Sequence, residues 1–552
     1  MMALSYSSGP SITPLLGITI GRQLERTTSR SPDALAVVSR HQSVRLTYAE
    51  LAARVETCAR ALLELGVQKG DRVGIWAGNC LEWLVVQYAT ARIGAILVTI
   101  NPAYRRHELR YALAQAGVSL LVAARAFRQT DYVAMLQDTR ADLPLLRFIA
   151  LLGMGADGMM AWDDFLGLAE NRTVAELRLR EETLDFDDAI NIQYTSGTTG
   201  APKGATLSHH NIHNNGYFVG LGCGYTSADR ICVPVPLYHC FGMVMGNLAA
   251  LTHGGSVVYP DVAFDPKATL EAIAAERCTS LYGVPTMFIA QLQHPEFGSY
   301  DLTSLRTGIM AGSPCPVEVM KQVIDRMHAR ELTICYGMTE TSPVSFQSLA
   351  EDDLEHRTAT VGAVHPHVEC KVVSPDTGRT VDRDQPGELC TRGYSVMLGY
   401  WDDPDATAAA IDDARWMHTG DLALMRPDGY VNIVGRIKDM VIRGGENIYP
   451  REVEEFLYSH PAVAEVQVIG VPDSKYGEEL CAWVRIREGC ALTDDEIRAF
   501  CRGQIASFKI PRYVRFCEGY PLTVTGKVRK VEMREISIRE LGLEVAAATV
   551  TA

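Results

Sequence analysis

Between residues 47 and 123 the spacing of the apolar positions changes several times, and each change marks a new element. Apolar residues with helical spacing predict helices at Tyr48–Leu65, Leu81–Gly94 and Arg106–Gly117. Short apolar runs between them predict strands at Arg72–Ala77, Ala95–Ile100 and Ser119–Ala123. Strands that alternate with helices in this way favour a mostly parallel sheet covered by helices.

The same alternation returns after residue 208. Helices are predicted at Lys267–Arg277 and Val317–Met327. Strands are predicted at Arg230–Leu237, Ser256–Tyr259, Thr279–Val284, Leu305–Ala311 and Leu332–Tyr336. We therefore expect two similar α/β layers packed together, with ligands beyond the carboxyl ends of their strands.

The pattern changes again after Thr360. Short strands and turns predict a small β-barrel or sandwich at about residues 360–432. After Arg436 a smaller α+β unit is predicted, with helices at Arg451–Ser459 and Asp494–Gln504 and strands around Val466–Val471 and Leu480–Ile486. The expected fold is α/β: a large domain of two α/β subdomains plus the β-barrel (1–435), then a small α+β domain (436–552), joined by a linker at 436–439.

Composition narrows the class of protein and its partners. The 552 residues are 47% apolar, which is enough for large cores and argues against disorder. A net charge of −14 makes nucleic acid an improbable partner, because binding it requires concentrated basic surface. The 14 cysteines include no C-x-x-C, so neither a zinc site nor a disulfide framework is indicated, and a cytoplasmic location is expected.

No membrane segment is predicted either. The N-terminus has no basic residue before Arg22 and is a poor signal peptide. The most apolar segment, Leu84–Ile100, contains Gln87 and Arg92 and falls short of a membrane span.

The richest candidate for chemistry is Tyr194–Asn211, YTSGTTGAPKGATLSHHN. It follows an alternating apolar run that predicts a strand, and it precedes a predicted helix near His209. Its glycines let backbone N–H groups curl inward, its hydroxyls add donors, and Lys203 adds a mobile positive charge. The stretch predicts a phosphate cradle, although it does not fit a Walker A motif. A second glycine patch, Gly220–Tyr225, is interpreted as a loop without a nucleotide role.

Two other polar segments offer complementary chemistry. In YGMTE (Tyr336–Glu340) an aromatic ring can stack on adenine, a hydroxyl can bind a phosphate, and a carboxylate can hold Mg²⁺. In HTGDLA (His418–Ala423) Asp421 follows a glycine, where an aspartate is usually a turn residue.

Taken together and in this order, the segments resemble the adenylate-forming superfamily, and within it the acyl-CoA synthetases. GRIKD around Arg436, GGENIYP (Gly444–Pro450) and PLTVTGKVRK (Pro521–Lys530) continue the resemblance, which spans about residues 20–537. It implies an enzyme that uses ATP and Mg²⁺ to convert a carboxylic acid to an acyl-adenylate and then transfers the acyl group to CoA. It also implies that the small domain is mobile.

The resemblance implies roles residue by residue. Lys527, Thr339, Glu340 and His239 would be catalytic, with Lys527 bridging the substrate carboxylate and the α-phosphate, His239 lining and gating the acyl channel, and Glu340 holding the metal. Lys438, Gly444 and Gly445 would serve the hinge and the path of CoA. ATP and AMP would be bound by Thr195, Ser196, Gly197, Thr198, Thr199, Lys203, Gly312, Ser313, Tyr336, Gly337, Thr339, Asp421, Arg436 and Lys527. Gly242, Gly246 and Ala249–Ala250 would keep the helix after His239 thin beside an acyl tunnel.

Asn101–Leu113 and Glu446–Val463 look most like medium-chain fatty-acyl-CoA synthetases. A competing hypothesis is an acyl-AMP ligase that loads a carrier protein; such ligases often carry an insertion, for which the 78 residues between Glu340 and Thr419 leave little room. The intact motif residues disfavour a non-catalytic binding protein. Luciferase-type oxygenation is disfavoured only by its rarity, and a homodimer is compatible with the resemblance.

Overall fold

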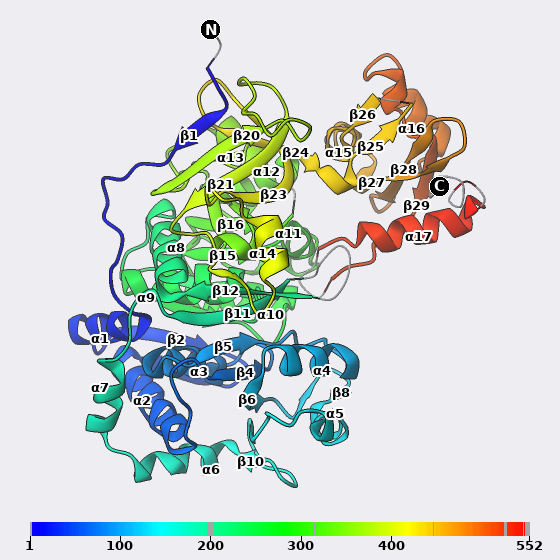
Figure 1. Cartoon of the computed structure of the whole chain (residues 1–552). Coiled ribbons are helices and arrows are strands. Elements are labelled where there is room, and N and C mark those ends of the chain that lie inside the picture. The colour runs from blue at the N-terminus through cyan, green and yellow to red at the C-terminus, as the bar shows by residue number, and fades with distance from the viewer. Residues whose placement is uncertain are drawn as a thin grey trace.

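The computed structural model describes residues 3–195, 202–313, 315–444, 446–523, 527–544 and 546. Two large sheets form the body of the molecule, as predicted (Figure 1). The first, in spatial order, consists of β10 (Met160–Ala161), β9 (Phe148–Leu151), β6 (Val118–Ala123), β4 (Arg72–Trp76), β5 (Ile96–Thr99), β11 (Ala189–Thr195), β12 (Lys203–Ser208) and β22 (Gly399–Tyr400). The second consists of β19 (Ala363–Val364), β18 (Val344–Gln347), β17 (Glu331–Gly337), β16 (Thr307–Ala311), β15 (Ser280–Gly283), β13 (Arg230–Cys232), β14 (Ser256–Tyr259), β2 (Leu35–Ser39) and β3 (Val44–Thr47).

The helices of this body follow the predicted positions closely where the pattern was periodic. They are α1 (Ile20–Arg30), α2 (Tyr48–Glu64), α3 (Leu81–Ile93), α4 (Arg106–Gln115), α5 (Tyr132–Thr139), α6 (Trp162–Gly167), α7 (Val174–Glu181), α8 (His209–Gly222), α9 (Ala249–His253), α10 (Pro266–Glu276), α11 (Pro285–Leu292), α12 (Val317–Arg326), α13 (Leu354–Ala359) and α14 (Pro404–Ala410). Short 3₁₀ turns occur at Arg140–Asp142, Leu168–Asn171, Phe297–Ser299 and Thr339–Thr341, and Phe241–Leu248 forms a π-helix.

A smaller antiparallel sheet stands where the sequence predicted the β-barrel. Its strands are β1 (Tyr6–Ser8), β20 (Val368–Val373), β21 (Gly387–Gly393), β23 (Met417–Met425) and β24 (Val431–Arg436). The edge strand β1 comes from the N-terminus and pairs antiparallel with β20, which the sequence did not indicate. Elsewhere a two-stranded ribbon is formed by β7 (Ala126–Phe127) and β8 (Thr130–Asp131).

The chain after Arg436 forms the predicted α+β unit. Its elements are β25 (Val441–Arg443), β26 (Glu446–Ile448), α15 (Pro450–Tyr458), β27 (Val463–Asp473), β28 (Gly477–Ile486), α16 (Asp494–Cys501), β29 (Tyr513–Phe516) and α17 (Lys530–Glu540), with 3₁₀ turns at Ile437–Asp439 and Ser507–Lys509. In Figure 1 this orange and red unit lies to one side of the body, and the chain ahead of α17 reaches back toward it.

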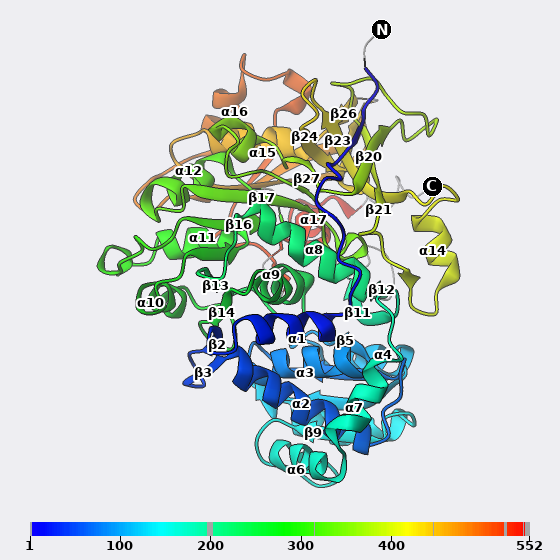
Figure 2. The same cartoon turned by 90° about the vertical axis from the view of Figure 1, so that its left-hand side faces the viewer.

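The apolar segment that begins at Leu84 belongs to α3 and β5, and α3 is buried on every side. Its polar side chains are paired, as burial requires: Gln87 donates to the carbonyl of Met243 (3.1 Å) and accepts from Asn247 (2.8 Å). Tyr88 donates to the carbonyl of Asn247 (3.0 Å). These bonds fasten the first α/β layer to the π-helix of the second. In Figure 2, α9, which continues the π-helix, lies above α1 and α3. No helix within the described residues is long and apolar enough to cross a membrane.

Two sequence expectations need correction. The patch Gly220–Tyr225 is not simply a loop, because α8 continues to Gly222. A β-carbon at Gly220 would lie 2.5 Å from the His253 ring, so the residue permits close packing of α8 on α9. The predicted strand Arg230–Leu237 is also shorter, since β13 ends at Cys232.

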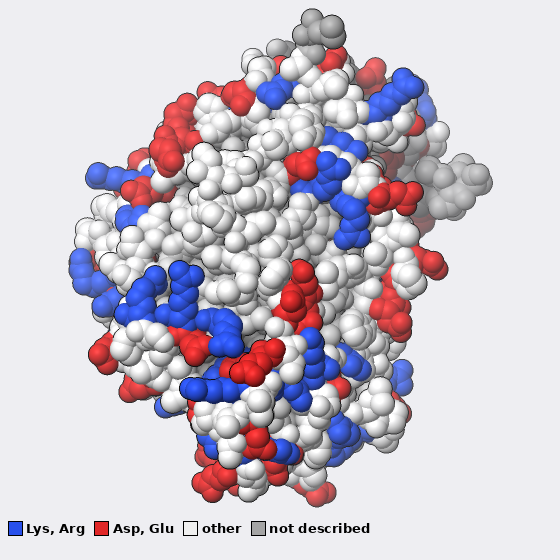
Figure 3. All heavy atoms as spheres, turned by 60° about the vertical axis from the view of Figure 1, so that its left-hand side comes forward, with Lys and Arg blue, Asp and Glu red and all other residues white. Residues whose placement is uncertain are grey.

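Acidic side chains are interspersed with basic ones on the surface (Figure 3). On the face shown in Figure 3, Lys and Arg side chains alternate with Asp and Glu, and a broad uncharged area crosses the middle. Such interspersed charge does not create a large basic field on this face.

Buried histidines make stability depend on pH. Burial lowers the pKa of His365 to about 3, and its side chain is paired through Nε2 with Gln347 Oε1 at 3.1 Å. Because the unfolded chain takes up this proton near pH 6.5 and the folded chain resists it, stability falls as pH drops from about 6.5 toward 3. One such group costs about 2 kcal/mol between pH 7 and pH 5.

We therefore predict that His365→Gln reduces the loss of stability between pH 7 and pH 5, measured as the fall in the urea midpoint of unfolding. His107→Gln, on the exposed face of α4, serves as the control and leaves the pH dependence unchanged. An identical fall in wild type and His365→Gln would show that this histidine is protonated equally in both states.

Candidate active site

The two strands that flank the predicted phosphate cradle pair with each other. β11 ends at Thr195 and pairs antiparallel with β12, so that Thr195 lies opposite Lys203. The sequence predicted a strand, the cradle and then a helix near His209, but a second strand, β12, lies between the cradle and α8. Of the predicted phosphate ligands, Ser196, Gly197, Thr198 and Thr199 lie outside the described residues.

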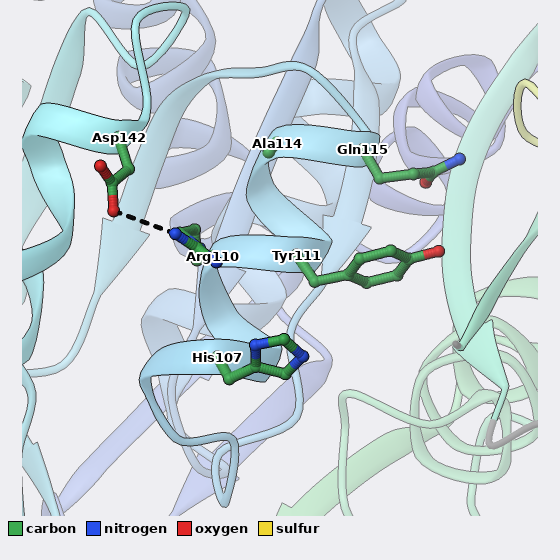
Figure 4. A pocket seen from close by; sticks show the side chains of 6 residues that line it. All are labelled: His107, Arg110, Tyr111, Ala114, Gln115 and Asp142. Atoms are coloured by element: carbon green, nitrogen blue, oxygen red, sulfur yellow. Dashed lines mark hydrogen bonds and ion pairs between the residues drawn. The ribbon is translucent and has the colours of Figure 1, made fainter. Parts of the chain in front are cut away.

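Helix α4 supports this hairpin from outside. Tyr111 donates to the carbonyl of Pro202 (3.1 Å), and Tyr194 donates to Gln115 Oε1 (2.6 Å). Gln115 in turn donates to the carbonyl of Trp401 (2.7 Å). Figure 4 shows these α4 side chains around an open hollow of about 610 Å³, where Arg110 forms an ion pair with Asp142. Side chains of α4 thus hold Tyr194 and Pro202, the residues on either side of the predicted cradle.

Glu340 lies at the point where the two large sheets meet. It belongs to the 3₁₀ turn after β17, and only 5% of it is exposed. Its Oε1 accepts hydrogen bonds from Tyr400 (2.9 Å) and from Thr195 (3.3 Å) of the first sheet. Thr339 lies beside it, 3.8 Å from the Cys240 thiol. Thr195, at the edge of the predicted cradle, and Glu340 of the YGMTE segment therefore lie side by side.

Gly337 makes the turn into this segment sterically feasible. A β-carbon there would lie 1.8 Å from the carbonyl oxygen of Pro343, a distance that no side chain can accept. Gly337, which was predicted to bind ATP, is therefore needed here for a close approach of two backbone segments, and its contact with ATP stays a prediction.

Asp421 is the centre of a second cluster. It lies opposite Arg436 in the β23–β24 register, and Arg436 Nε donates to its Oδ1 at 3.0 Å. Tyr336 donates to its Oδ2 at 2.6 Å, and burial together with this carboxylate raises the pKa of Tyr336. Glu388, which sequence reasoning did not identify, accepts from the Gly420 N–H (3.1 Å) and so supports the turn before Asp421.

Lys527 reaches this site from the C-terminal unit. Gly312 has a φ of +90°, and its β-carbon position would be 3.8 Å from Lys527 Cε. Ser313 follows it and is half-buried. Burial, and secondly the charge of Arg436, lower the pKa of Lys527, while Asp421 and Glu340 act in the opposite direction. Lys527 is therefore surrounded by the residues that the sequence placed in the adenylation site.

His239 lies on the same side of the site, ahead of the π-helix. Its Nδ1 accepts from the Phe241 N–H (3.1 Å). Its desolvated position, and then the Lys527 charge, lower its pKa to about 3, so it is neutral at physiological pH. The helix that follows is a π-helix and not the expected thin α-helix. A β-carbon at Gly242 would lie 2.5 Å from the carbonyl oxygen of Pro236, and one at Gly246 would lie 3.2 Å from the Val233 side chain.

Of the three residues predicted for the hinge and for CoA, the structure describes Lys438 and Gly444. Lys438 is exposed in the 3₁₀ turn Ile437–Asp439. Gly444, with a φ of +60°, donates its N–H to the carbonyl of Tyr476 (2.8 Å) within the C-terminal unit. Gly445 lies outside the described residues.

Tyr400 is the site residue that sequence reasoning missed. Its hydroxyl contacts Glu340, and its ring lies 5.1 Å from Lys203 Nζ. A Gly-Tyr-Trp run after a predicted β-region gave no chemical signal, because the tyrosine acts only through residues distant in sequence.

Comparison with known proteins agrees with this geometry. The AMP-binding enzyme family matches residues 24–401, and the AMP-binding enzyme C-terminal domain matches residues 452–527. The chain belongs to the AMP-binding enzymes. The predicted adenylate-forming superfamily is thereby confirmed.

Relatives and structural neighbours lie within the same superfamily. The chain is 49% identical to a Bacillus subtilis (strain 168) protein named as an acyl-CoA synthetase, YngI, covering 96% of this chain and 99% of that protein. It is 44% identical to the mitochondrial medium-chain acyl-CoA ligase ACSF2 of Danio rerio, covering 98% and 92%. The anthranilate CoA ligase AuaEII, solved with anthranoyl-AMP, superposes with a TM-score of 0.84 at 25% identity, covering 95% and 98%.

We predict that Asp421→Asn weakens ATP binding by roughly ten- to a hundredfold, the range for losing a charge-assisted hydrogen bond. The amide keeps the shape but leaves Arg436 without its anionic partner. Equilibrium binding of a fluorescent ATP analogue measures the effect, and Asp376→Asn in an exposed turn is the control. Unchanged affinity in Asp421→Asn would contradict a nucleotide-binding role.

Proposed function

We propose that this enzyme is an ATP-dependent acyl-CoA synthetase that activates a fatty acid as acyl-AMP and then forms the acyl-CoA thioester. The observation that supports it most is the position of Lys527, which the C-terminal unit inserts between Gly312 and the Asp421–Arg436 pair. A cation at this position can bridge the substrate carboxylate and the α-phosphate of ATP.

In the first step a substrate carboxylate oxygen attacks the α-phosphorus of ATP, and the bond to pyrophosphate breaks. Lys527 and Lys203 balance the negative charge that gathers on the phosphate oxygens. Asp421 and Arg436 hold the ribose, and Tyr336 lies beside the adenine. His239, being neutral, takes no proton in this step and instead contributes to the wall of the site.

The donors around Glu340 fit Mg²⁺. Its carboxylate lies within hydrogen-bond reach of the Thr195 hydroxyl, and oxygen donors are the ligands that this hard cation prefers. When bound, Mg²⁺ would neutralise phosphate charge and favour departure of pyrophosphate. Glu340 would hold it, with the Thr195 and Thr339 hydroxyls facing the phosphates.

In the second step the CoA thiol attacks the acyl carbon, the bond to AMP breaks, and the thiol proton passes to solvent. A cavity of about 760 Å³ next to Tyr238 offers room for the pantetheine arm. Arg105 and Arg128 stand at its rim, and Leu522 and Thr523 of the C-terminal unit form part of its wall. Movement of that unit about residues 436–439 would open this cavity and bring Gly444 and Gly445 toward the site.

The relatives support a medium-chain fatty acid as the substrate. Free cysteines, most of them buried, suit a reducing compartment, and we place the enzyme in the cytoplasm. Transfer to a carrier protein remains the alternative that the half-reaction experiments below distinguish, and a homodimer is an expectation about assembly.

We predict that Lys527→Ala slows adenylation by at least about 10²-fold, the scale for removing a preorganised charge-stabilising donor. Pyrophosphate exchange measures this step. Transfer of a supplied acyl-AMP to CoA should survive, because the lysine serves the first step alone. Arg529→Ala, whose side chain is 56% exposed in the same segment, is the control. Equal loss in both half-reactions would contradict the proposal that the C-terminal unit takes different positions in adenylation and in thioester formation.

We predict that Lys438→Pro leaves pyrophosphate exchange largely intact but impairs thioester formation. Proline restricts φ at its own position and the conformation of Ile437, so the linker loses the freedom that a hinge needs. Lys438→Ala removes the side-chain charge without restricting φ, so it distinguishes an effect of the lost charge from an effect of the restricted backbone. Half-reactions are measured with CoA and with a carrier protein. Wild-type transfer to the carrier protein alone would overturn CoA as the acceptor.

A further inference from the structure

Tyr400 occupies a position where two sheets and two opposite charges meet. β22 pairs antiparallel with β12, which sets Tyr400 opposite Ala205 and diagonal to Lys203 on the same face. The ring consequently lies 5.1 Å from Lys203 Nζ, a cation–π distance. Its hydroxyl donates at 2.9 Å to Oε1 of Glu340, which lies in the 3₁₀ turn that follows β17 of the other sheet.

The backbone around Tyr400 is held from several directions. Its own N–H donates to Thr407 Oγ1 (2.9 Å). The Trp401 N–H donates to the carbonyl of Gly204 (2.7 Å), and the Trp401 carbonyl accepts from Gln115 (2.7 Å). A side chain with so little freedom can determine where its partners lie.

Tyr400 also separates charges that would otherwise attract each other. Lys203 and Glu340 both contact this one side chain, and the ion pairs found among the described residues include none between these two. A direct ion pair would cover the lysine and the carboxylate oxygens that phosphate and metal need. The tyrosine gives each charge a neutral partner instead.

We propose that Tyr400 is a positioning residue that holds the Glu340 carboxylate for the divalent cation and keeps Lys203 available for phosphate. The proposal rests on the function argued above, in which Glu340 binds Mg²⁺ and Lys203 binds ATP. It adds a specific division of work: the hydroxyl acts on the metal ligand, and the ring acts on the lysine.

Two variants test this division. Tyr400→Phe keeps the ring and removes the hydroxyl, so the dissociation constant of Mn²⁺ in the presence of ATP should rise by about tenfold, as expected for losing a hydrogen bond to a charged group. Binding of ATP in the presence of EDTA should not change. Tyr400→Leu removes both contacts and should weaken metal-free ATP binding as well.

The measurements are made on the full chain without a carboxylic acid: electron paramagnetic resonance for Mn²⁺ and a fluorescent analogue for ATP. Tyr430→Phe is the matched control, because that hydroxyl also donates to a carboxylate, Asp352 Oδ1 at 2.6 Å, outside the site. If Tyr400→Leu does not fold, Tyr400→Phe carries the test alone.

The possible outcomes distinguish the role of Tyr400 from the metal-binding role of Glu340 on which it rests. Unchanged Mn²⁺ binding in Tyr400→Phe, together with weakened binding in Glu340→Gln, would overturn the role of Tyr400 and leave the metal site standing. Unchanged Mn²⁺ binding in Glu340→Gln would overturn the metal assignment itself. Equal weakening of Mn²⁺ and metal-free ATP binding in Tyr400→Phe would mean a general structural defect and would also overturn the proposal.

Discussion

The burial of one ammonium group governs how the two parts of this protein meet. Lys527 leaves solvent when the C-terminal unit docks, and its pKa falls because burial and Arg436 disfavour the charge. Asp421 and Glu340 offset that cost only in part. Asp421 and Glu340 therefore do not fully balance the charge of Lys527, and the phosphates of ATP would supply further negative charge. We infer that nucleotide binding and domain docking favour each other.

The rest of the architecture keeps the partners of that lysine in place. Asp421 and Arg436 are neighbours because two strands pair in one register. Glu340 is fixed by bonds that cross from one large sheet to the other, through Thr195 and Tyr400. Behind them α3 and the π-helix are joined by the bonds of Gln87 and Asn247. The elements that carry these side chains are thus tied to their neighbours by hydrogen bonds between buried polar groups.

Much of this could be predicted because periodic segments report their own structure. α2, α4 and β14 lie almost where the spacing of apolar residues placed them, since their burial depends on local alternation. β12 was missed because Lys203–Ser208 is short and follows a glycine-rich stretch, where strand and helix entry look alike. β2 was missed as a member of the second sheet because its partner, β14, lies more than two hundred residues away.

The site shows the same division. Lys203, Glu340 and Asp421 could be proposed as site residues from the sequence, because each lies in a motif typical of the adenylate-forming superfamily. Tyr400 could not, because a phenol has no distinctive role until the carboxylate it contacts is known. The π-helix after His239 was equally hidden, since Phe241–Leu248 is apolar throughout and its periodicity cannot separate 3.6 residues per turn from a wider coil.

The positions of His239 and Lys527 bear on how the enzyme could pass from adenylation to thioester formation without releasing the acyl-adenylate. His239 is neutral and held by the N–H of Phe241, so the wall beside the acyl carbon can persist while the C-terminal unit moves. Lys527 alone must leave, and Gly444 lies on a different loop of the same unit, bonded to Tyr476. Once pyrophosphate departs, the negative charge that favours Lys527 in the site falls. We propose that loss of that charge weakens docking of the C-terminal unit before the thiol enters, so that electrostatics favours the order of the two steps.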